Sequence, residues 1–264
     1  MKYSIITINY NNRDGLERTI QSVINQTYQD FEYIIIDGGS TDGSVDIIKK
    51  YADRIDYWVS EPDKGIYNAM NKGVLQAHGT YVNFMNSGDC FYSNEVLRTV
   101  LKYLSYDIIL GKSYYQNGPH GFKKKNISFL DLYKNSLPHQ AAFCRRELFD
   151  NSLFDENYKI VSDWKFFLDT LLFKNASFLN VDDIICLYEF GGISSTAISQ
   201  VDVERATIIN SYFPERVISD YEFWCQIDSP ILKLIPQMSQ MYYFQKFVYY
   251  LIVVLLKINS IFRQ

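Results

Sequence analysis

The chain of 264 residues is 47% hydrophobic and 21% charged, which supplies enough apolar material for a full-sized core and excludes an intrinsically disordered protein. Its 26 lysines and arginines stand against 30 aspartates and glutamates, so there is no basic excess to neutralise a nucleic-acid backbone. We therefore expect no nucleic-acid partner, while a single nucleotide stays a candidate ligand.

The first 110 residues alternate short apolar runs with segments of helical period. The apolar runs predict strands at residues 3–8, 33–36, 55–59, 81–85 and 107–110. Between the first two runs, Leu16, Ile20 and Val23 recur with the spacing of an amphipathic helix, and similar stripes follow the later runs. Strands and helices that alternate in this way form βαβ units. We therefore predict an α/β fold with a mostly parallel sheet flanked by helices.

The end of the chain carries a different pattern. Residues 247–256 are ten consecutive apolar or tyrosine residues, flanked by Lys246 and Lys257. A spanning helix needs about 20 apolar residues, so this run is too short to cross a bilayer comfortably. A helix lying on a membrane surface and a helix buried in the core or in a homodimer interface both fit the pattern.

The cysteines and the N-terminus bear on the compartment. The four cysteines lie far apart and form no Cys-x-x-Cys pair, which argues against a zinc site and against a secreted disulfide framework. Residues 3–8 follow Met1 and Lys2 directly and lack the pattern of a signal peptide. We therefore expect a reduced chain in the cytoplasm.

Polar clusters follow four consecutive predicted strands, at residues 9–12, 37–43, 61–65 and 86–89. Each cluster alone also suits an ordinary turn or a helix cap. Ligands of open α/β sheets bind beyond the carboxyl ends of the strands, however, and four clusters at one edge predict a ligand site. Tyr10 is suited to stack on a base, Asp37 to accept from a base or a ribose, and Asp89 to hold a divalent cation against a diphosphate.

The order of these clusters resembles family 2 glycosyltransferases, in particular the branch that builds bacterial exopolysaccharide, colanic-acid-type and O-antigen chains. The resemblance rests on Ser4–Asn11, Asp37–Gly43, Glu61–Gly73 and Asn86–Asp89, and it extends more weakly to about residue 195. It implies a GT-A fold and a hexosyltransferase-type enzyme that inverts the anomeric centre. The implied donor is a nucleotide-diphosphate sugar, with UDP as the expected nucleotide. The implied acceptor is a glycan, expected to be lipid-linked, in bacterial surface polysaccharide biosynthesis at the inner face of the cell membrane.

The resemblance also implies roles for single residues. Tyr10 and Asp37 would hold the nucleotide base, and Asp63 and Lys64 would lie beside the base and the diphosphate. Asn9, Asn86 and Asp89 complete the expected donor-binding set. The Asp-x-Asp motif of the family is replaced by Asn86-Ser87-Gly88-Asp89, so Asp89 is the expected ligand of Mn²⁺ or Mg²⁺ and Asn86 a candidate second one.

The second half supplies a candidate base. Inverting transfer needs a carboxylate that takes the proton of the acceptor hydroxyl. Ser162-Asp163-Trp164 is similar to the Glu-Asp-aromatic motif of the family, with serine in place of glutamate, which makes Asp163 the expected catalytic base. An ordinary N-cap of the following helix is the alternative. His139 and Gln140 match a His-Gln pair of the family and are candidates for the acceptor or donor cleft, or for a structural role.

These observations predict three parts of the chain. Residues 1–110 would bind the nucleotide sugar, residues 111–200 would bind the acceptor and supply the base, and residues 201–264 would form a helical C-terminal extension. Residues 191–195 resemble a loop near the active site of the family. A GT-A-fold protein that binds glycans or serves as a scaffold without catalysis is the alternative function, because carboxylates of the family are missing at positions 86, 88 and 162.

Overall fold

The computed structural model describes residues 1–115, 118–122, 127–189, 198–226 and 242–261, so the loop expected at 191–195 lies outside the described residues. The chain forms two compact units, Met1–Ile208 and Ile209–Gln264, and the division falls within helix α8 (Ile198–Tyr212), a little beyond the boundary suggested by the sequence. The first unit contains the sheet and is described first.

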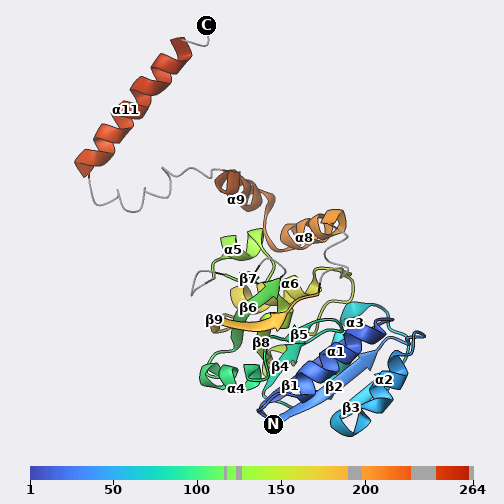
Figure 1. Cartoon of the computed structure of the whole chain (residues 1–264). Coiled ribbons are helices and arrows are strands. Elements are labelled where there is room, and N and C mark those ends of the chain that lie inside the picture. The colour runs from blue at the N-terminus through green and yellow to red at the C-terminus, as the bar shows by residue number, and fades with distance from the viewer. Residues whose placement is uncertain (116–117, 123–126, 190–197, 227–241, 262–264) are drawn as a thin grey trace. The chain divides into compact units, whose positions relative to one another are not determined.

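The described residues contain one nine-stranded sheet in the order β3-β2-β1-β4-β8-β6-β9-β5, with β7 paired to β6 (Figure 1). The strands are β1 (Tyr3–Asn9), β2 (Phe31–Asp37), β3 (Tyr57–Ser60), β4 (Tyr81–Phe84), β5 (Cys90–Phe91), β6 (Ile108–Tyr115), β7 (Gly118–His120), β8 (Ala142–Arg145) and β9 (Phe178–Leu187). The first four strands run parallel, as predicted, whereas β8 pairs antiparallel with both β4 and β6. In the second half, β6 pairs parallel with β9 and antiparallel with β7. The α/β fold is therefore confirmed, but the sheet is mixed and not mostly parallel as expected, because antiparallel pairings join the strands of the second half.

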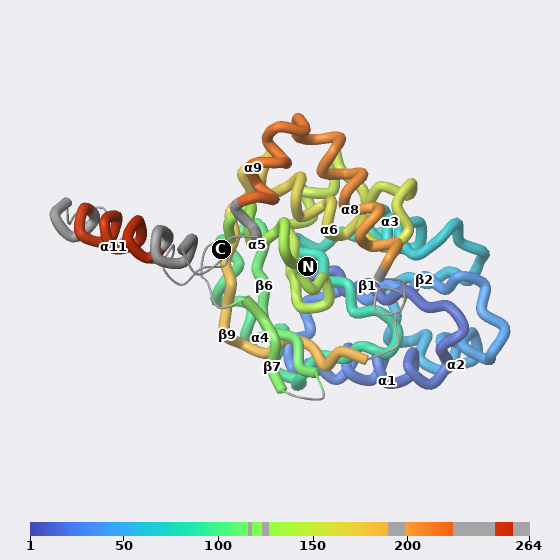
Figure 2. Tube along the Cα trace, turned by 90° about the horizontal axis from the view of Figure 1, so that it is seen from above, coloured from blue at the N-terminus to red at the C-terminus, as the bar shows by residue number. Residues whose placement is uncertain are grey.

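Helices cover both faces of the parallel strands. The three that connect these strands are α1 (Arg13–Ile24), α2 (Ser44–Lys50) and α3 (Ile66–Gln76). Figure 2 shows α1 and α2 on one side of β1 and β2 and α3 on the other side. All seven residues of β1 are buried, as expected for a strand covered on both faces. Gly73 allows α3 to approach closely, because a Cβ atom there would lie 2.5 Å from Ile6 Cγ2.

The second half of this unit consists mainly of short elements. Its helices are α4 (Val96–Val100), α5 (Phe129–Lys134) and α6 (Ser162–Leu168), and α6 runs on into a π-helical turn, Asp169–Phe173. Four 3-10 turns complete the described elements of the unit, at Ala52–Arg54, Leu101–Tyr103, His139–Ala141 and Arg146–Phe149. The turn at His139 and the start of α6 carry the catalytic candidates of the second half.

The second unit includes the helices α9 (Glu215–Gln226) and α11 (Tyr242–Ile261). Large apolar side chains of α11 are exposed, among them Phe247, Tyr250, Leu251, Val254 and Leu255. Within the described part of the chain, no helix has both the length and the apolar character to span a membrane. Helix α11 therefore has an exposed apolar surface but does not combine the length and the apolar character of a membrane span.

Candidate active site

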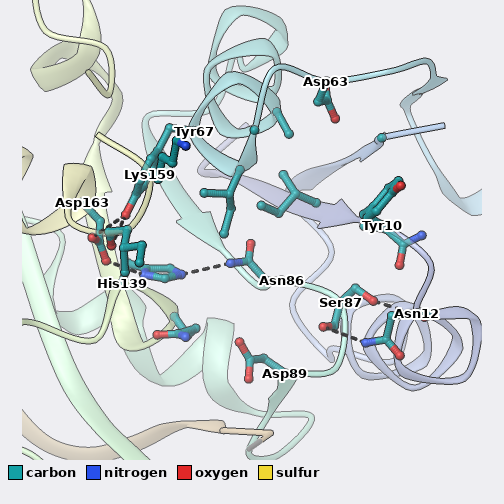
Figure 3. A pocket seen from close by; sticks show the side chains of 18 of the residues that line it. Tyr10, Asn12, Asp63, Tyr67, Asn86, Ser87, Asp89, His139, Lys159 and Asp163 are labelled. Carbon is teal, nitrogen blue, oxygen red and sulfur yellow. Dashed lines mark hydrogen bonds and ion pairs between the residues drawn. The ribbon is translucent and has the colours of Figure 1, made fainter. Parts of the chain in front are cut away.

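A cavity of about 860 Å³ opens at the carboxyl ends of the parallel strands. It collects residues from the ends of β1, β4 and β9, from α3, and from the segments before β8 and α6 (Figure 3). Eight of the residues expected from the sequence line it: Asn9, Tyr10, Asp63, Asn86, Asp89, His139, Gln140 and Asp163. The cavity thus brings together residues of both halves of the sheet, as ligand binding beyond the strand ends requires.

A chain of hydrogen bonds joins Asp163, His139 and Asn86 (Figure 3). Asp163 Oδ2 lies 2.9 Å from His139 Nδ1, and His139 Nε2 lies 3.0 Å from Asn86 Nδ2. Because an amide nitrogen donates, this arrangement makes Nε2 the acceptor and leaves the imidazole proton on Nδ1, from which it is donated to Asp163. His139 is therefore held in one orientation between the carboxylate and the amide.

The carboxyl group of Asp163 is also fixed on its other side. Its Oδ1 accepts hydrogen bonds from the Tyr67 hydroxyl and from the backbone N–H of Trp164, both at 2.9 Å. Burial raises the pKa of Asp163, but the hydrogen bonds from His139 and Tyr67 outweigh this effect and hold the pKa below its usual value. Asp163 is not the N-cap, because α6 begins at Ser162 with Val161 in that position. It is an ionised, oriented acceptor on the cavity wall.

Helix α8 holds the segment that carries Asp163, a role that no motif in the sequence signalled. Glu204 accepts the backbone N–H groups of Lys159 and Ile160 at 3.0 Å and of Val161 at 3.3 Å. The neighbouring Arg205 completes the attachment: its guanidinium lies 4.4 Å from the ring centre of Trp164 and donates to the carbonyls of Leu132, Tyr133 and Asn135. The segment is thus anchored on both sides of Asp163.

The end of the cavity that contains Tyr10 begins at three strand ends in register. Asn9 lies opposite Asp37, and Asp37 lies opposite Ser60, on β1, β2 and β3. Asp37 is fully buried and accepts from Asn9 Nδ2 (2.7 Å), Ser60 Oγ (2.6 Å), and both the N–H and the hydroxyl of Ser40. Burial raises its pKa, but these bonds together bring the pKa below its usual value. Asp37 does not line the cavity; it ties the strand ends together.

Tyr10 and Asp63 line the cavity next to these strand ends. The Tyr10 side chain is 69% exposed and lines the cavity, so one face of its ring is free for stacking. Asp63 is paired with Lys72 at 2.6 Å. Gly38 gives both side chains room, because a Cβ there would meet the Tyr10 ring at 3.1 Å and Asp63 Oδ2 at 3.2 Å. Lys64, by contrast, is exposed and is not among the lining residues.

Asp89 lies at the floor of the cavity beside Glu189, which the sequence did not single out. Asp89 is 5% exposed, and Asp89 Oδ1 accepts the N–H of Glu189 at 3.0 Å. Burial raises the pKa of Asp89 to about 6, so the group is mainly ionised at neutral pH. Glu189 also lines the cavity and pairs with Arg18.

Asp89 and Asn86 offer oxygen atoms that suit a divalent cation. The described residues contain no cluster of three His, Cys, Asp or Glu side chains with the geometry of a metal site. Asn86 Oδ1 is buried without a hydrogen-bond partner, and carboxylate and amide oxygens are hard donors. Mg²⁺ in particular is often held by one or two carboxylates together with the phosphates of a substrate. These residues therefore fit a cation that takes most of its ligands from a bound diphosphate.

The chain matches known glycosyltransferases in sequence and in fold. The model of the family described as Glycosyl transferase family 2 matches residues 4–164. A PGL/p-HBAD biosynthesis glycosyltransferase of Mycobacterium bovis is 30% identical over 216 residues, which cover 77% of this chain and 83% of that protein.

Two solved structures extend the match to the fold. S. aureus TarS in complex with UDP-GlcNAc superimposes with a TM-score of 0.65 at 23% identity, over 82% of this chain and 69% of that one. The mannosyltransferase PcManGT from Pyrobaculum calidifontis, in complex with GDP-Man and Mn²⁺, gives a TM-score of 0.58 at 16% identity, over 73% of this chain and 58% of that one. The predicted GT-A fold is confirmed by these neighbours. The chain belongs to glycosyl transferase family 2 and is a glycosyltransferase.

Proposed function

We propose that the protein is an inverting transferase that moves a sugar from a UDP-sugar onto a glycan acceptor in the synthesis of a bacterial surface polysaccharide or glycolipid. The observation that carries this proposal is the cavity itself, with a free tyrosine face at one end and an ionised, oriented carboxylate, Asp163, at the other. The names of relatives support the substrate class: one acts in PGL/p-HBAD biosynthesis and another is a putative teichuronic acid biosynthesis glycosyltransferase of Bacillus subtilis. TarS bound to UDP-GlcNAc supports UDP as the nucleotide.

The proposed reaction assigns a task to each end of the cavity. Tyr10 stacks on the base, while Asn9, Asp63 and the strand ends organised by Asp37 surround the nucleoside. Asp163 accepts the proton of the acceptor hydroxyl as its oxygen forms a bond to the anomeric carbon. The bond between that carbon and the diphosphate breaks, and the diphosphate leaves with the electron pair. Tyr67 and His139 keep the carboxylate of Asp163 in place during this step.

A divalent cation, Mn²⁺ or Mg²⁺, is part of the proposal. Four carboxylates line the cavity, and two of them, Asp63 and Glu189, are paired with Lys72 and Arg18. This leaves Asp89 and Asp163 against one ammonium group of the lining, that of Lys159. Such a wall repels a diphosphate unless a positive charge accompanies it. Asp89 and Asn86 Oδ1 are the residues that would hold the cation, whose chemistry is to neutralise the charge of the leaving diphosphate. The Mn²⁺ of the mannosyltransferase complex supports this assignment.

The test is donor binding by the full-length protein. The melting temperature is measured with UDP-GlcNAc, GDP-mannose or no donor, each with Mn²⁺ and with excess chelator, because a ligand that binds only the folded state stabilises it. We expect stabilisation by UDP-GlcNAc with Mn²⁺, a smaller effect with chelator, and no metal-dependent effect in Asp89→Asn. A protein that binds UDP-GlcNAc but neither hydrolyses nor transfers it would fit the glycan-binding scaffold instead.

The exposed apolar side chains of α11 support a peripheral contact with the membrane that carries a lipid-linked acceptor. The helix contains Lys246 and Lys257 and no acidic residue, and at 1.5 Å per residue its 20 residues extend about 30 Å. Apolar and basic residues on one helix favour the surface of an anionic bilayer. Flotation with vesicles containing anionic lipid should capture the wild type and not the double variant Leu251→Glu, Leu255→Glu. If that variant instead converts a dimer to a monomer in light scattering, α11 is a subunit interface.

A further inference from the structure

Some charged side chains that line the cavity have a partner of opposite charge, and others do not. Asp63 is paired with Lys72 and Glu189 with Arg18, whereas Asp163 is hydrogen-bonded to His139. Lys159 is the one lysine or arginine among the described residues that line the cavity, and it forms no ion pair with a carboxylate of the described residues. The cavity therefore contains one ammonium group that is not neutralised by the protein.

The backbone around Lys159 is anchored by a contact with helix α8, and the residue is exposed. The Lys159 N–H donates to Glu204 Oε1 at 3.0 Å, which anchors the residue from below. The nearest carboxylate in the sequence, Glu156, accepts from the amides of Asn68 and Asn71, both at 3.0 Å, so it is already engaged. The side chain of Lys159 is exposed. A long cationic side chain on a fixed backbone is well placed to reach a ligand in the cavity.

The position of Lys159 in the cavity indicates that it would contact the acceptor and not the donor. Figure 3 shows Lys159 beside Tyr67 at the end of the cavity that holds Asp163 and His139, with Tyr10 at the other end. A base must face the acceptor hydroxyl from the side opposite the leaving diphosphate, so the Asp163 end is the acceptor end. An ammonium at this end is remote from the nucleoside and next to the hydroxyl that receives the sugar.

We propose that Lys159 forms a binding site for an anionic group of the acceptor, a phosphate ester or a sugar carboxylate, beside the hydroxyl that is glycosylated. The proposal rests on the proposed transferase reaction, which makes this end the acceptor end. An anion that enters a wall rich in carboxylates is favoured only where a positive charge is free, and Lys159 supplies that charge. A neutral glycan would gain little from it. The site thus selects acidic acceptors over neutral ones.

Binding of three soluble probes tests the site in the full-length protein saturated with UDP and Mg²⁺. Octyl glucoside is neutral, octyl glucuronide carries a carboxylate, and octyl phosphate carries a phosphate. We compare the wild type with Lys159→Gln and with the matched control Lys49→Gln, which removes an exposed lysine of α2 outside the cavity. Calorimetry gives the dissociation constant of each probe and of UDP.

We expect the wild type and Lys49→Gln to bind at least one anionic probe more tightly than octyl glucoside. Lys159→Gln should weaken that probe on the order of 10-fold, as expected for a hydrogen-bonded charge pair, and should leave octyl glucoside unchanged. The tighter anionic probe identifies phosphate or carboxylate as the natural group.

Three results would overturn the site. They are equal binding of all three probes by the wild type, equal binding of the anionic probes by the two lysine variants, and a loss of UDP affinity in Lys159→Gln, which would assign the lysine to the diphosphate. Failure of the wild type to bind UDP would instead contradict the proposed function, and the two failures are therefore distinguishable.

Discussion

Replacing Asp163 with asparagine should abolish transfer and leave donor binding intact. The variant keeps the size of the side chain but removes the charge that accepts the proton, and general bases contribute about 10²- to 10⁴-fold to a rate. We expect kcat to fall by that factor, which corresponds to about 3 to 5 kcal/mol in the activation barrier. The dissociation constant of UDP should stay within about twofold, because Tyr10 and Asp63 lie at the other end of the cavity (Figure 3).

The Asp163→Asn substitution should also lower the stability of the folded protein. Asp163 accepts from Tyr67, from the N–H of Trp164 and from His139, and asparagine keeps only one acceptor oxygen. One of these donors therefore loses its partner, at about 1 to 3 kcal/mol in the free energy of unfolding. Urea unfolding measures this cost, so that the assay can be run where the variant is folded.

The matched control is Asp155→Asn, which removes a carboxylate of the same segment outside the cavity, 3.8 Å from Lys165. The assay is single-turnover transfer from UDP-GlcNAc, with calorimetry of UDP binding alongside. A folded Asp163→Asn protein that binds UDP and transfers within a few-fold of the wild type would refute the assignment of Asp163 as the base. Equal losses in Asp163→Asn and Asp155→Asn would point to a general effect of charge on the segment.

Two further predictions concern residues that act behind the cavity wall. Because the folded pKa of Asp37 lies below its unfolded value, its bonds stabilise the protein above about pH 4 and lose this effect as the pH falls through the folded pKa. Asp37→Asn should therefore lower the free energy of unfolding by about 1 to 3 kcal/mol at pH 7 and make it less dependent on pH in the acid range. Urea unfolding between pH 3 and 7 measures this. The same slope of unfolding free energy against pH in both proteins would contradict the prediction. Glu204→Gln should lower kcat with little change in UDP affinity, because it loosens the backbone at Lys159, Ile160 and Val161. The control is Glu215→Gln. Equal changes in the two variants, or a loss of UDP binding alone, would argue against a positioning role for Glu204.

The parallel half of the fold was predictable because local pattern and topology agree there. A buried run at residues 3–8 predicts β1, and the structure has Tyr3–Asn9. The later order of the sheet was not predictable in the same way. Strand β8 (Ala142–Arg145) has four residues and no periodicity, and its place between β4 and β6 depends on antiparallel pairing with partners distant in sequence. Short strands give too few residues for a period to be read.

The position of the cavity was predictable from the sequence, but the contacts of single residues in it were not. Four polar clusters after four strands predicted one site, and Asn9, Tyr10, Asp63 and Asp89 do line one cavity. The direction of single hydrogen bonds was beyond the sequence. Asp37 was expected to face the nucleotide, yet the register that aligns it with its neighbours on β1 and β3 surrounds it with protein donors. A strand-end carboxylate can serve the ligand or the sheet, and only the partners around it decide.

Asp163, the proposed base, shows why a motif predicts a residue better than it predicts the residue's environment. Asp163 could be proposed from three letters of sequence, because a carboxylate before an aromatic residue is a local pattern. What makes this carboxylate an oriented, ionised acceptor comes from far along the chain: Tyr67 from α3, and Glu204 behind it from α8. Neither contact leaves a periodic or compositional trace, since each depends on two segments that meet only after folding. The same holds for the free charge of Lys159, which is defined by which carboxylates are already engaged. The environment of Asp163 and Lys159, where we propose that the acceptor binds, is therefore a property of the packed unit.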